Sequence, residues 1–374
     1  MKLASRLGIL GLTFLLFSFF FSAPLAAKKA PEKPKKAPSF ERKSVWISSP
    51  PLKPRFFRNK ITLIYFWDYV SIGSLRELKV LKDWEKLYAP FGLQIVMIHA
   101  PEFPAAKAQG NVEAAVQRLK ISFPVVLDND FKLWEAYAVK SWPTKILVDQ
   151  EGLIRYQRGG ESAYLETENK IRSLLSKNYP VSSLPEPIFT EEPEKFAIAS
   201  CGPMSMDTYL GHKRSGWWGA RIADRPWGAV KDETVNFRDR GDRAERGFFA
   251  EGLWVNEEDA LVHARSTERL SDYAGLLYIA REAYAFLSRE KETGASRVYV
   301  TRDGAPVPSS FRGSDLREDV EGGTYFLYEE PRLYYLIHNE DLEPHELKVW
   351  TSAKGVAVHS FSFSNRCLSD FEHL

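Results

Sequence analysis

The sequence predicts two folded domains: an α/β domain with a mixed central sheet and helices on both faces, and then an all-β sandwich. Strand-like and helix-like segments alternate from Val45 to Tyr179, which favours βαβ units. Beyond Glu194 helical periodicity fades, and short apolar runs are separated by Gly, Pro, Asp and Asn, as in β-sandwiches. The folded part, about 330 residues, exceeds what one core normally holds.

The elements of the first domain follow from the apolar pattern along the chain. Strands are expected at Ile61–Trp67, Gly92–His99 and Val125–Asp128, and a hairpin at Lys145–Asp149 and Leu153–Arg158. Helices are expected at Ser74–Tyr88, Asn111–Lys120, Asp130–Val139 and Tyr164–Lys177. The early βαβ units imply parallel pairing, and the late hairpin adds antiparallel strands.

The second domain, placed at 200–370, shows eight strand-like runs. They are Arg246–Val255, Ala260–Ala264, Gly275–Ser288, Ser296–Thr301, Thr324–Leu327, Arg332–His338, His345–Thr351 and Val356–Ser364. A helix within Ile279–Arg289 remains an alternative at this point. Residues 180–199, which contain four prolines, are expected to be a linker between the first domain (45–179) and the second.

The N-terminal segment predicts export. Residues 1–27 combine a basic start, an uncharged run from Leu7 to Phe21 and alanines at the end, as in a signal peptide. A retained N-terminal anchor is the alternative. Residues 28–44, rich in Lys, Pro and Ala, are expected to be a disordered tether that is either a solvated spacer or attracted to anionic envelope surfaces. An extracytoplasmic, periplasmic location follows.

Charge and composition exclude some classes of partner. The formal net charge is +2, and without the two leading segments the folded body is mildly acidic. No concentrated basic footprint indicates nucleic-acid binding. Membrane contact is expected only if the N-terminal segment stays uncleaved, and no cofactor is expected.

The turn after the first strand reads Ser71-Ile72-Gly73-Ser74. Thiol–disulfide enzymes place a Cys-x-x-Cys pair in such a turn, where a helix N-terminus lowers the thiol pKa. Serine cannot form a disulfide. Either Ser71 or Ser74 is expected to cap the helix, and Ser74 fits a capping box with Glu77. A serine nucleophile would need a positioned base, and His99 is not obviously aimed at the turn, so no catalytic residue is assigned.

Four segments of the first domain resemble the TlpA/DipZ-type thioredoxin-like (redoxin) proteins of bacterial envelopes. They are WISSPPL (Trp46–Leu52), YFWDYVSIGSLR (Tyr65–Arg76), FPVVLDNDFKLWEAY (Phe123–Tyr137) and WPTKILVDQEGLIRY (Trp142–Tyr156). The resemblance implies a thioredoxin-like fold in which Pro143 is a cis-proline that faces the redox motif beside Trp142. A peptide groove there and a bare turn before the strand both remain open. This sequence differs from the family pattern at Ser71 and Ser74, where the family has cysteines.

The second domain resembles the C-terminal domain of DipZ-type proteins through four looser motifs. They are Asp207–Gly211, Gly252–Trp254, Arg332–Leu336 and Gly355–Phe363. That domain looks like a jelly-roll similar to carbohydrate-binding modules. Trp217, Trp218 and Trp227 are candidate ligand aromatics that could stack on sugars, anchor a partner protein, or instead pack over the end of the sandwich.

The remaining candidate residues are two cysteines and a histidine-containing loop. Cys201 and Cys367, the only cysteines, are expected to form a structural disulfide in an exported protein. The residues from His338 to His345 lack regular ligand spacing, so no metal site is assigned.

Together these features favour a non-catalytic envelope protein that binds or scaffolds a polypeptide or a cell-wall glycan. One alternative is a thiol–disulfide oxidoreductase with residual activity, supported by Cys201 or by a partner's thiols. The other is a carbohydrate-binding module carried on an inert thioredoxin-like spacer.

Overall fold

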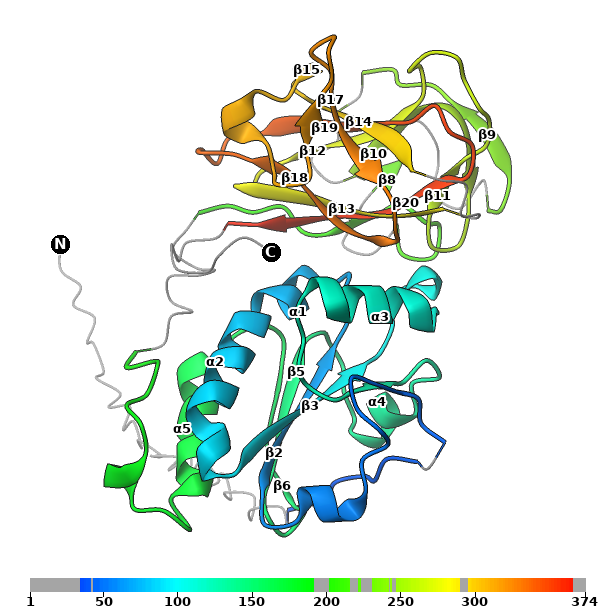
Figure 1. Ribbon diagram of the computed structural model, residues 1–374. Helices are drawn as coiled ribbons and strands as arrows, with labels where there is room; N and C mark the ends of the chain where they lie inside the picture. The colour runs from blue at the N-terminus through cyan, green and yellow to red at the C-terminus, as the bar shows by residue number, and fades with distance from the viewer. Residues whose placement is uncertain are drawn as a thin grey trace, which may run out of the picture. The chain divides into compact units, whose positions relative to one another are not determined.

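The computed structural model describes residues 34–41, 43–191, 202–215, 221–222, 231–241, 243, 247–289 and 295–365 (Figure 1). Residues Lys35–Leu374 form one compact unit. The expected signal peptide lies outside the described residues, as do Cys201, Cys367, Trp217, Trp218 and Trp227. Within the described ranges, no helix combines the length and apolar character needed to cross a membrane.

The first domain contains a six-stranded mixed sheet in the order β1-β4-β3-β2-β5-β6. The strands are β1 (Trp46–Ile47), β2 (Ile61–Trp67), β3 (Leu93–His99), β4 (Val125–Leu127), β5 (Thr144–Val148) and β6 (Ile154–Gly159). Parallel pairing joins β2, β3 and β4, while β1, β5 and β6 pair antiparallel. The predicted mixed sheet is therefore confirmed.

Helices cover both faces of this sheet. They are α1 (Ile72–Arg76), α2 (Leu78–Tyr88), α3 (Gln109–Arg118), α4 (Lys132–Ala136) and α5 (Tyr164–Leu175). Side chains of α1, α2, α3 and α5 pack with Leu63 and Tyr65 of β2, and those of α4 pack on the other face with Ile64 and Phe66. This alternation along β2 is what a strand buried on both faces produces.

The last part of the expected tether is ordered, which corrects the prediction of disorder for this stretch. Ala37 donates its backbone N–H to Gly152 O at 2.8 Å, and Ile154 donates to Lys35 O at 2.8 Å. The Phe40 ring packs on Trp46 with a centroid distance of 5.1 Å. Backbone pairing with the β5–β6 hairpin and burial of Phe40 together outweigh the polar composition.

The beginning of the expected linker also packs on the first domain. The backbone N–H groups of Ile188 and Phe189 both donate to the Glu168 carboxylate at 2.9 Å. The Phe189 ring stacks on Tyr164 of α5 with centroids 5.4 Å apart. Leu184 and Phe189 of the linker therefore extend the first domain's core.

Among its described residues, the second domain contains fourteen strands. They are β7 (Thr208–Tyr209), β8 (Arg221–Ile222), β9 (Thr234–Phe237), β10 (Gly247–Asn256), β11 (Leu261–His263), β12 (Tyr273–Tyr278), β13 (Glu282–Arg289), β14 (Ser296–Arg302), β15 (Ala305–Pro306), β16 (Arg317–Glu318), β17 (Thr324–Tyr328), β18 (Arg332–His338), β19 (His345–Trp350) and β20 (Val356–Ser364). The run predicted as Gly275–Ser288 is two strands, β12 and β13, and the alternative of a helix at Ile279–Arg289 is wrong.

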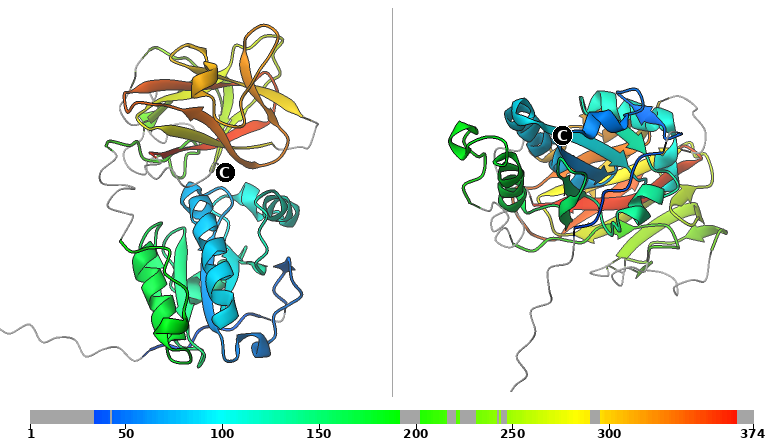
Figure 2. Two further views of the ribbon diagram at one scale, coloured as in Figure 1. Left: turned by 60° about the vertical axis from the view of Figure 1, so that its left-hand side comes forward. Right: turned by 90° about the horizontal axis from the view of Figure 1, so that it is seen from below.

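The strands form two packed layers, seen from two further directions in Figure 2. One layer runs β16-β17-β14-β19-β12, the other runs β11-β20-β13-β18, and β10 pairs with strands of both. In β10, Gly252 has φ +100°, and a Cβ at this position would lie 2.1 Å from the Asp272 carboxyl carbon. Glycine therefore allows β10 to turn from one layer into the other. The predicted sandwich is confirmed, antiparallel except where β8 pairs with β10.

Candidate functional site

The turn between β2 and α1 is shaped by its two serine hydroxyls. Ser71 is the N-cap of α1, and its Oγ accepts the Ser74 backbone N–H at 3.4 Å. The Ser74 Oγ accepts the Asp68 backbone N–H at 3.4 Å. Of the two serines that could cap the helix, the structure uses Ser71. The expected capping box between Ser74 and Glu77 does not form, because Glu77 binds a different partner.

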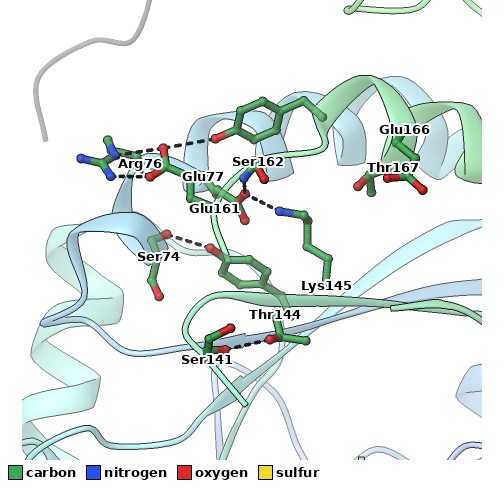
Figure 3. Close-up of polar contacts among 12 residues, drawn as sticks. Ser74, Arg76, Glu77, Ser141, Thr144, Lys145, Glu161, Ser162, Glu166 and Thr167 are labelled. Carbon is green, nitrogen blue, oxygen red and sulfur yellow. Dashed lines mark hydrogen bonds and ion pairs between the residues drawn. The ribbon is translucent and has the colours of Figure 1, made fainter. Parts of the chain in front are cut away.

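That partner is Lys145, which forms an ion pair with Glu77 behind the turn (Figure 3). Lys145 is 0% exposed and Glu77 is 1% exposed, and the Ser162 backbone N–H donates to Glu77 Oε1 at 3.0 Å. Burial raises the pKa of Glu77 above its ordinary value, although the Lys145 ammonium opposes the rise. Sequence reasoning missed this pair, although a lysine within the buried strand KILVD was a signal for it.

A second ion pair fixes the end of α1. The Arg76 guanidinium contacts both carboxylate oxygens of Glu161 in a fork-like arrangement, with Nε 2.9 Å from each (Figure 3). Tyr65 on β2 donates its hydroxyl to the Ser74 carbonyl at 3.0 Å, and burial holds the pKa of Tyr65 well above its ordinary value. The turn is thus anchored from the sheet beneath it and from the segment before α5.

Pro143 lies against the serine turn, as the resemblance implied. A Cβ at Gly73 would be 3.3 Å from Pro143 Cδ, and the Trp142–Pro143 bond is cis. The half-buried Trp142 donates its indole N–H to Ala100 O at 2.7 Å. Its backbone N–H and C=O have no hydrogen bond to any described residue. We call Ser71, Gly73, Trp142 and Pro143 the motif–proline face.

His99 does not activate either serine. It is 0% exposed, and its Nε2 lies 3.2 Å from Asp68 Oδ1. Among the described hydrogen bonds, none joins His99 to Ser71 or Ser74. A serine nucleophile needs a base within hydrogen-bonding reach, so this arrangement offers no activated nucleophile.

The β-sandwich contacts the first domain close to this turn. Glu102, in the loop after β3, accepts hydrogen bonds from the Tyr209 hydroxyl and the Arg214 guanidinium, both at 2.8 Å. The Arg214 guanidinium lies 4.0 Å from the centre of the Phe103 ring. Burial raises the pKa of Glu102 to about 7, although Arg214 lowers it. No sequence motif marked these contacts, because they join segments more than a hundred residues apart.

The structure adds little support for the other predicted sites. The disulfide Cys201–Cys367 and the candidate aromatics Trp217, Trp218 and Trp227 fall on residues outside the described ranges. In the histidine-containing loop, the His345 imidazole is bound on one side to Asp303 Oδ2 at 2.8 Å and on the other to Asp341 Oδ1 at 2.9 Å. Both of its ring nitrogens are therefore bound, one to a loop residue and one to the turn between β14 and β15.

Comparison with protein families identifies both domains. Residues 34–157 match the AhpC/TSA family, and residues 205–364 match the family of thioredoxin-like C-terminal domains. The chain therefore carries an AhpC/TSA-type domain followed by a thioredoxin-like C-terminal domain. The predicted resemblance and the predicted fold class are confirmed.

Individual curated proteins and solved structures are similar to parts of this chain. The DipZ protein of Mycobacterium tuberculosis is 30% identical over 291 residues, which cover 77% of this chain and 39% of DipZ. The chain therefore spans about two fifths of the length of this relative. The thiol-disulfide oxidoreductase ResA of Geobacillus thermodenitrificans is 26% identical over 99 residues, or 26% of this chain and 54% of ResA. A thiol-disulfide isomerase structure from Corynebacterium glutamicum has 19% identity and a TM-score of 0.35, covering 37% of this chain and 97% of its own.

Proposed function

We propose that this chain is an exported thioredoxin-like protein that binds a segment of unfolded polypeptide at the motif–proline face without exchanging disulfides. The observation that carries the proposal is the pair Ser71 and Ser74 in a turn that is otherwise built like a redox site. The turn and the adjacent Pro143 are both present, and the buried Glu77–Lys145 pair lies behind the turn. The two sulfur atoms are replaced by hydroxyls.

The chemistry of serine supports the non-catalytic half of the proposal. Disulfide exchange requires a thiolate that attacks a sulfur atom and a second thiol that resolves the mixed disulfide. The Ser71 and Ser74 hydroxyls instead accept backbone N–H groups of the turn. Their role in this structure is to hold the turn in shape.

The binding half rests on the backbone at Trp142. Its N–H and C=O have no partner among the described residues, and the indole ring is half-buried beside them. An extended chain can pair with such groups as a strand does, while a nearby aromatic ring contributes apolar contact. Ser71 and Gly73 are also half-buried, so part of this side of the turn is exposed.

The proposed location is extracytoplasmic. It rests on the leading segment, where a basic start is followed by an uncharged apolar run and alanines. Fractionation of cells that produce the full-length chain tests this directly. The protein should appear in the extracytoplasmic or envelope fraction, and recovery with the cytosolic fraction would contradict the proposal.

A permanently unfolded polypeptide tests the binding. The probe is fluorescently labelled α-lactalbumin whose cysteines have been reduced and carboxymethylated, so that no thiol chemistry contributes. Fluorescence anisotropy should show saturable binding to the full-length protein. Trp142→Ala should weaken it about tenfold or more, since a lost anchoring aromatic at an interface commonly costs over 1.4 kcal/mol.

Trp46→Ala is the matched control. Trp46 is also a half-buried tryptophan of the first domain, but it lies on the edge strand β1, where it pairs with Val126. This variant should bind the probe like the wild type. Equal binding by wild type and Trp142→Ala would show that the motif–proline face is not the binding site.

A further inference from the structure

A pocket of about 210 Å³ lies in the first domain, on the face of the sheet that α4 covers. Its floor is formed by Thr62 and Ile64 of β2 and by Val148 of β5. Thr62 is the second residue of β2, whereas the serine turn follows the end of this strand at Trp67. At about 3.3 Å per residue, the strand places Thr62 about 16 Å from Trp67. The pocket is therefore separate from the motif–proline face.

The segment before β1 forms one wall of this pocket. We call its residues 36–40 the strap. Backbone hydrogen bonds to the β5–β6 hairpin hold one end of the strap. At the other end, the Tyr137 hydroxyl donates to Pro38 O at 2.8 Å, and the Phe40 ring stacks on Phe57 with centroids 5.6 Å apart. The pocket is therefore a fixed part of the fold, which lowers the entropic cost of binding a ligand.

Aromatic rings contribute much of the wall. Phe40, Phe57 and Tyr137 line the pocket together with the aliphatic floor, and Phe40 and Phe57 are only half-buried. Aromatic side chains pack well against another ring, either offset or edge-on. Pockets for drug-sized ligands have volumes of about 300–1,000 Å³, so this smaller pocket suits a ligand with a single ring.

A buried polar pair lies at the pocket floor. Thr62 is 2% exposed, and its Oγ1 accepts the side-chain N–H of Gln94 at 2.7 Å. Gln94 stands opposite Thr62 on β3 and is 7% exposed. Its Oε1 has no hydrogen-bond partner among the described residues, and none of them accepts the Thr62 hydroxyl proton. Because unpaired buried polar groups are costly, this pair favours a ligand with a polar group at the floor.

Rotating the Gln94 amide would not satisfy the pair. Oε1 would then accept the Thr62 hydroxyl proton, and the amide nitrogen would lack a partner instead. A ligand hydroxyl suits both arrangements, because it donates one hydrogen bond and accepts others. The pair therefore favours a hydroxyl over a group that only donates or only accepts.

The charges of the lining favour an anion at the outer end of the pocket. Lys36 and Asp149 are the two charged lining residues. The Asp149 carboxylate is bound by the Arg155 guanidinium and by the backbone N–H groups of Glu151 and Leu153, at 3.0 and 2.9 Å. Lys36 is exposed, and within the described ranges no carboxylate forms an ion pair with it. Its ammonium therefore remains to attract a negative charge.

From this geometry we propose that the pocket binds a small phenolic carboxylate, a single ring with a hydroxyl at one end and a carboxylate at the other. The ring packs among Phe40, Phe57 and Tyr137. The hydroxyl pairs with Thr62 at the floor, and the carboxylate lies near the Lys36 ammonium. The site does not depend on the motif–proline face or on the polypeptide proposed to bind there. The probe is para-hydroxyphenylacetate.

Isothermal titration of the full-length protein with three probes tests the proposal. Saturable binding of para-hydroxyphenylacetate is expected. Phenylacetate lacks the hydroxyl, and tyramine carries an ammonium group where the first probe has its carboxylate. Each should bind about fivefold more weakly or worse, since a single hydrogen bond of ordinary strength corresponds to about this factor.

Two variants connect these preferences to the chain. Thr62→Val keeps the shape of the side chain and should abolish the preference for para-hydroxyphenylacetate over phenylacetate. Lys36→Gln should abolish the preference for para-hydroxyphenylacetate over tyramine. The matched control is Lys79→Gln, at an exposed lysine of α2 on the other face of the sheet, and it should bind all three probes like the wild type.

Three outcomes would overturn the proposal. The first is an absence of saturable binding at millimolar para-hydroxyphenylacetate, in which case the pocket holds only water. The second is equal affinity of the wild type for all three probes, which would mean unspecific apolar binding. The third is that the folded variants keep the preferences of the wild type. If Thr62→Val fails to fold, Lys36→Gln decides alone, because it changes an exposed residue and leaves the floor intact.

Discussion

Both outer faces of the β-sandwich carry aromatic side chains, but those on one face are buried and most of those on the other are partly exposed. On β13 and β18, Tyr284, Phe286 and Tyr335 are at most 4% exposed and share a core with residues of the first domain. We call this set the covered face. On the other layer, neighbouring strands align four aromatic side chains that we call the aromatic row, namely Tyr273, Trp350, Tyr299 and Tyr325. All but Tyr273 are partly exposed. The comparison shows which aromatics already have a partner within the chain.

The hydroxyl groups of the two faces show the same difference. Tyr284 and Tyr335 both donate to the buried Glu282, at 3.0 and 3.2 Å, so that their polar atoms are satisfied within an apolar interface. In the aromatic row the partners are Asp239 and Asp319, at the margin of the sheet. Buried polar groups require such partners, and these four tyrosine hydroxyls all find them within the chain.

The largest expected effect comes from truncating the covered face. Phe286 is 0% exposed and packs on Phe103, with ring centroids 4.9 Å apart. Phe286→Ala should lower the free energy of unfolding by about 3–5 kcal/mol. Trp350→Ala should lower it by only about 1 kcal/mol. Urea unfolding of the two variants measures both, and equal losses would show that the faces do not differ as described.

The next effect depends on pH. Because burial raises the pKa of Glu102 to about 7, the folded state holds this proton more tightly than the unfolded chain. The stability that Glu102 contributes is therefore complete below about pH 4.5 and is lost as pH rises to about 7, by up to about 3 kcal/mol. Glu102→Gln should remove this dependence.

The measurement is the difference between the wild-type and Glu102→Gln unfolding free energies from pH 4.5 to pH 8. Subtraction cancels groups common to both proteins, such as Asp207, whose pKa burial raises to about 6. A difference that stays constant over this range would show that Glu102 is ionised throughout in the folded protein.

The smallest effect is expected at the margin of the covered face. Arg118 Nε lies 3.0 Å from Glu330 Oε1, and the two side chains are 34% and 31% exposed. Such partly exposed pairs contribute about 0–1 kcal/mol. A double-mutant cycle with Arg118→Ala and Glu330→Ala should give a coupling energy in this range. A coupling energy above about 2 kcal/mol would mean that this ion pair contributes substantially to the stability of the contact between the domains, contrary to this account.

Much of the fold could be predicted because buried strands and amphipathic helices leave local patterns. Ile61–Trp67 and Lys145–Asp149 were recognisable as strands, and the position of Pro143 beside the turn followed from the resemblance. Contacts across the chain were not predictable. Nothing local pairs Glu77 with Lys145 or brings Glu102 to Arg214, because these contacts depend on how distant elements pack.

The aromatic row shows the same limit on sequence reasoning. Its strands were predicted, but the register that aligns Tyr273, Trp350 and Tyr299 depends on pairing between segments far apart in the chain. The tryptophans chosen from the sequence, Trp217, Trp218 and Trp227, stood out because they are clustered locally. A row of side chains across a sheet is formed by residues that are distant in sequence.

The central claim is that the redox framework is present and only its thiols are replaced. Insulin reduction in the presence of dithiothreitol tests it most directly, with the full-length protein and its Ser71→Cys/Ser74→Cys variant. The account predicts that the wild type accelerates precipitation of reduced insulin no more than a buffer control, and that the double variant accelerates it clearly. Turnover by the wild type that is lost in Cys201→Ser, or a folded double variant that remains at background, would contradict the claim.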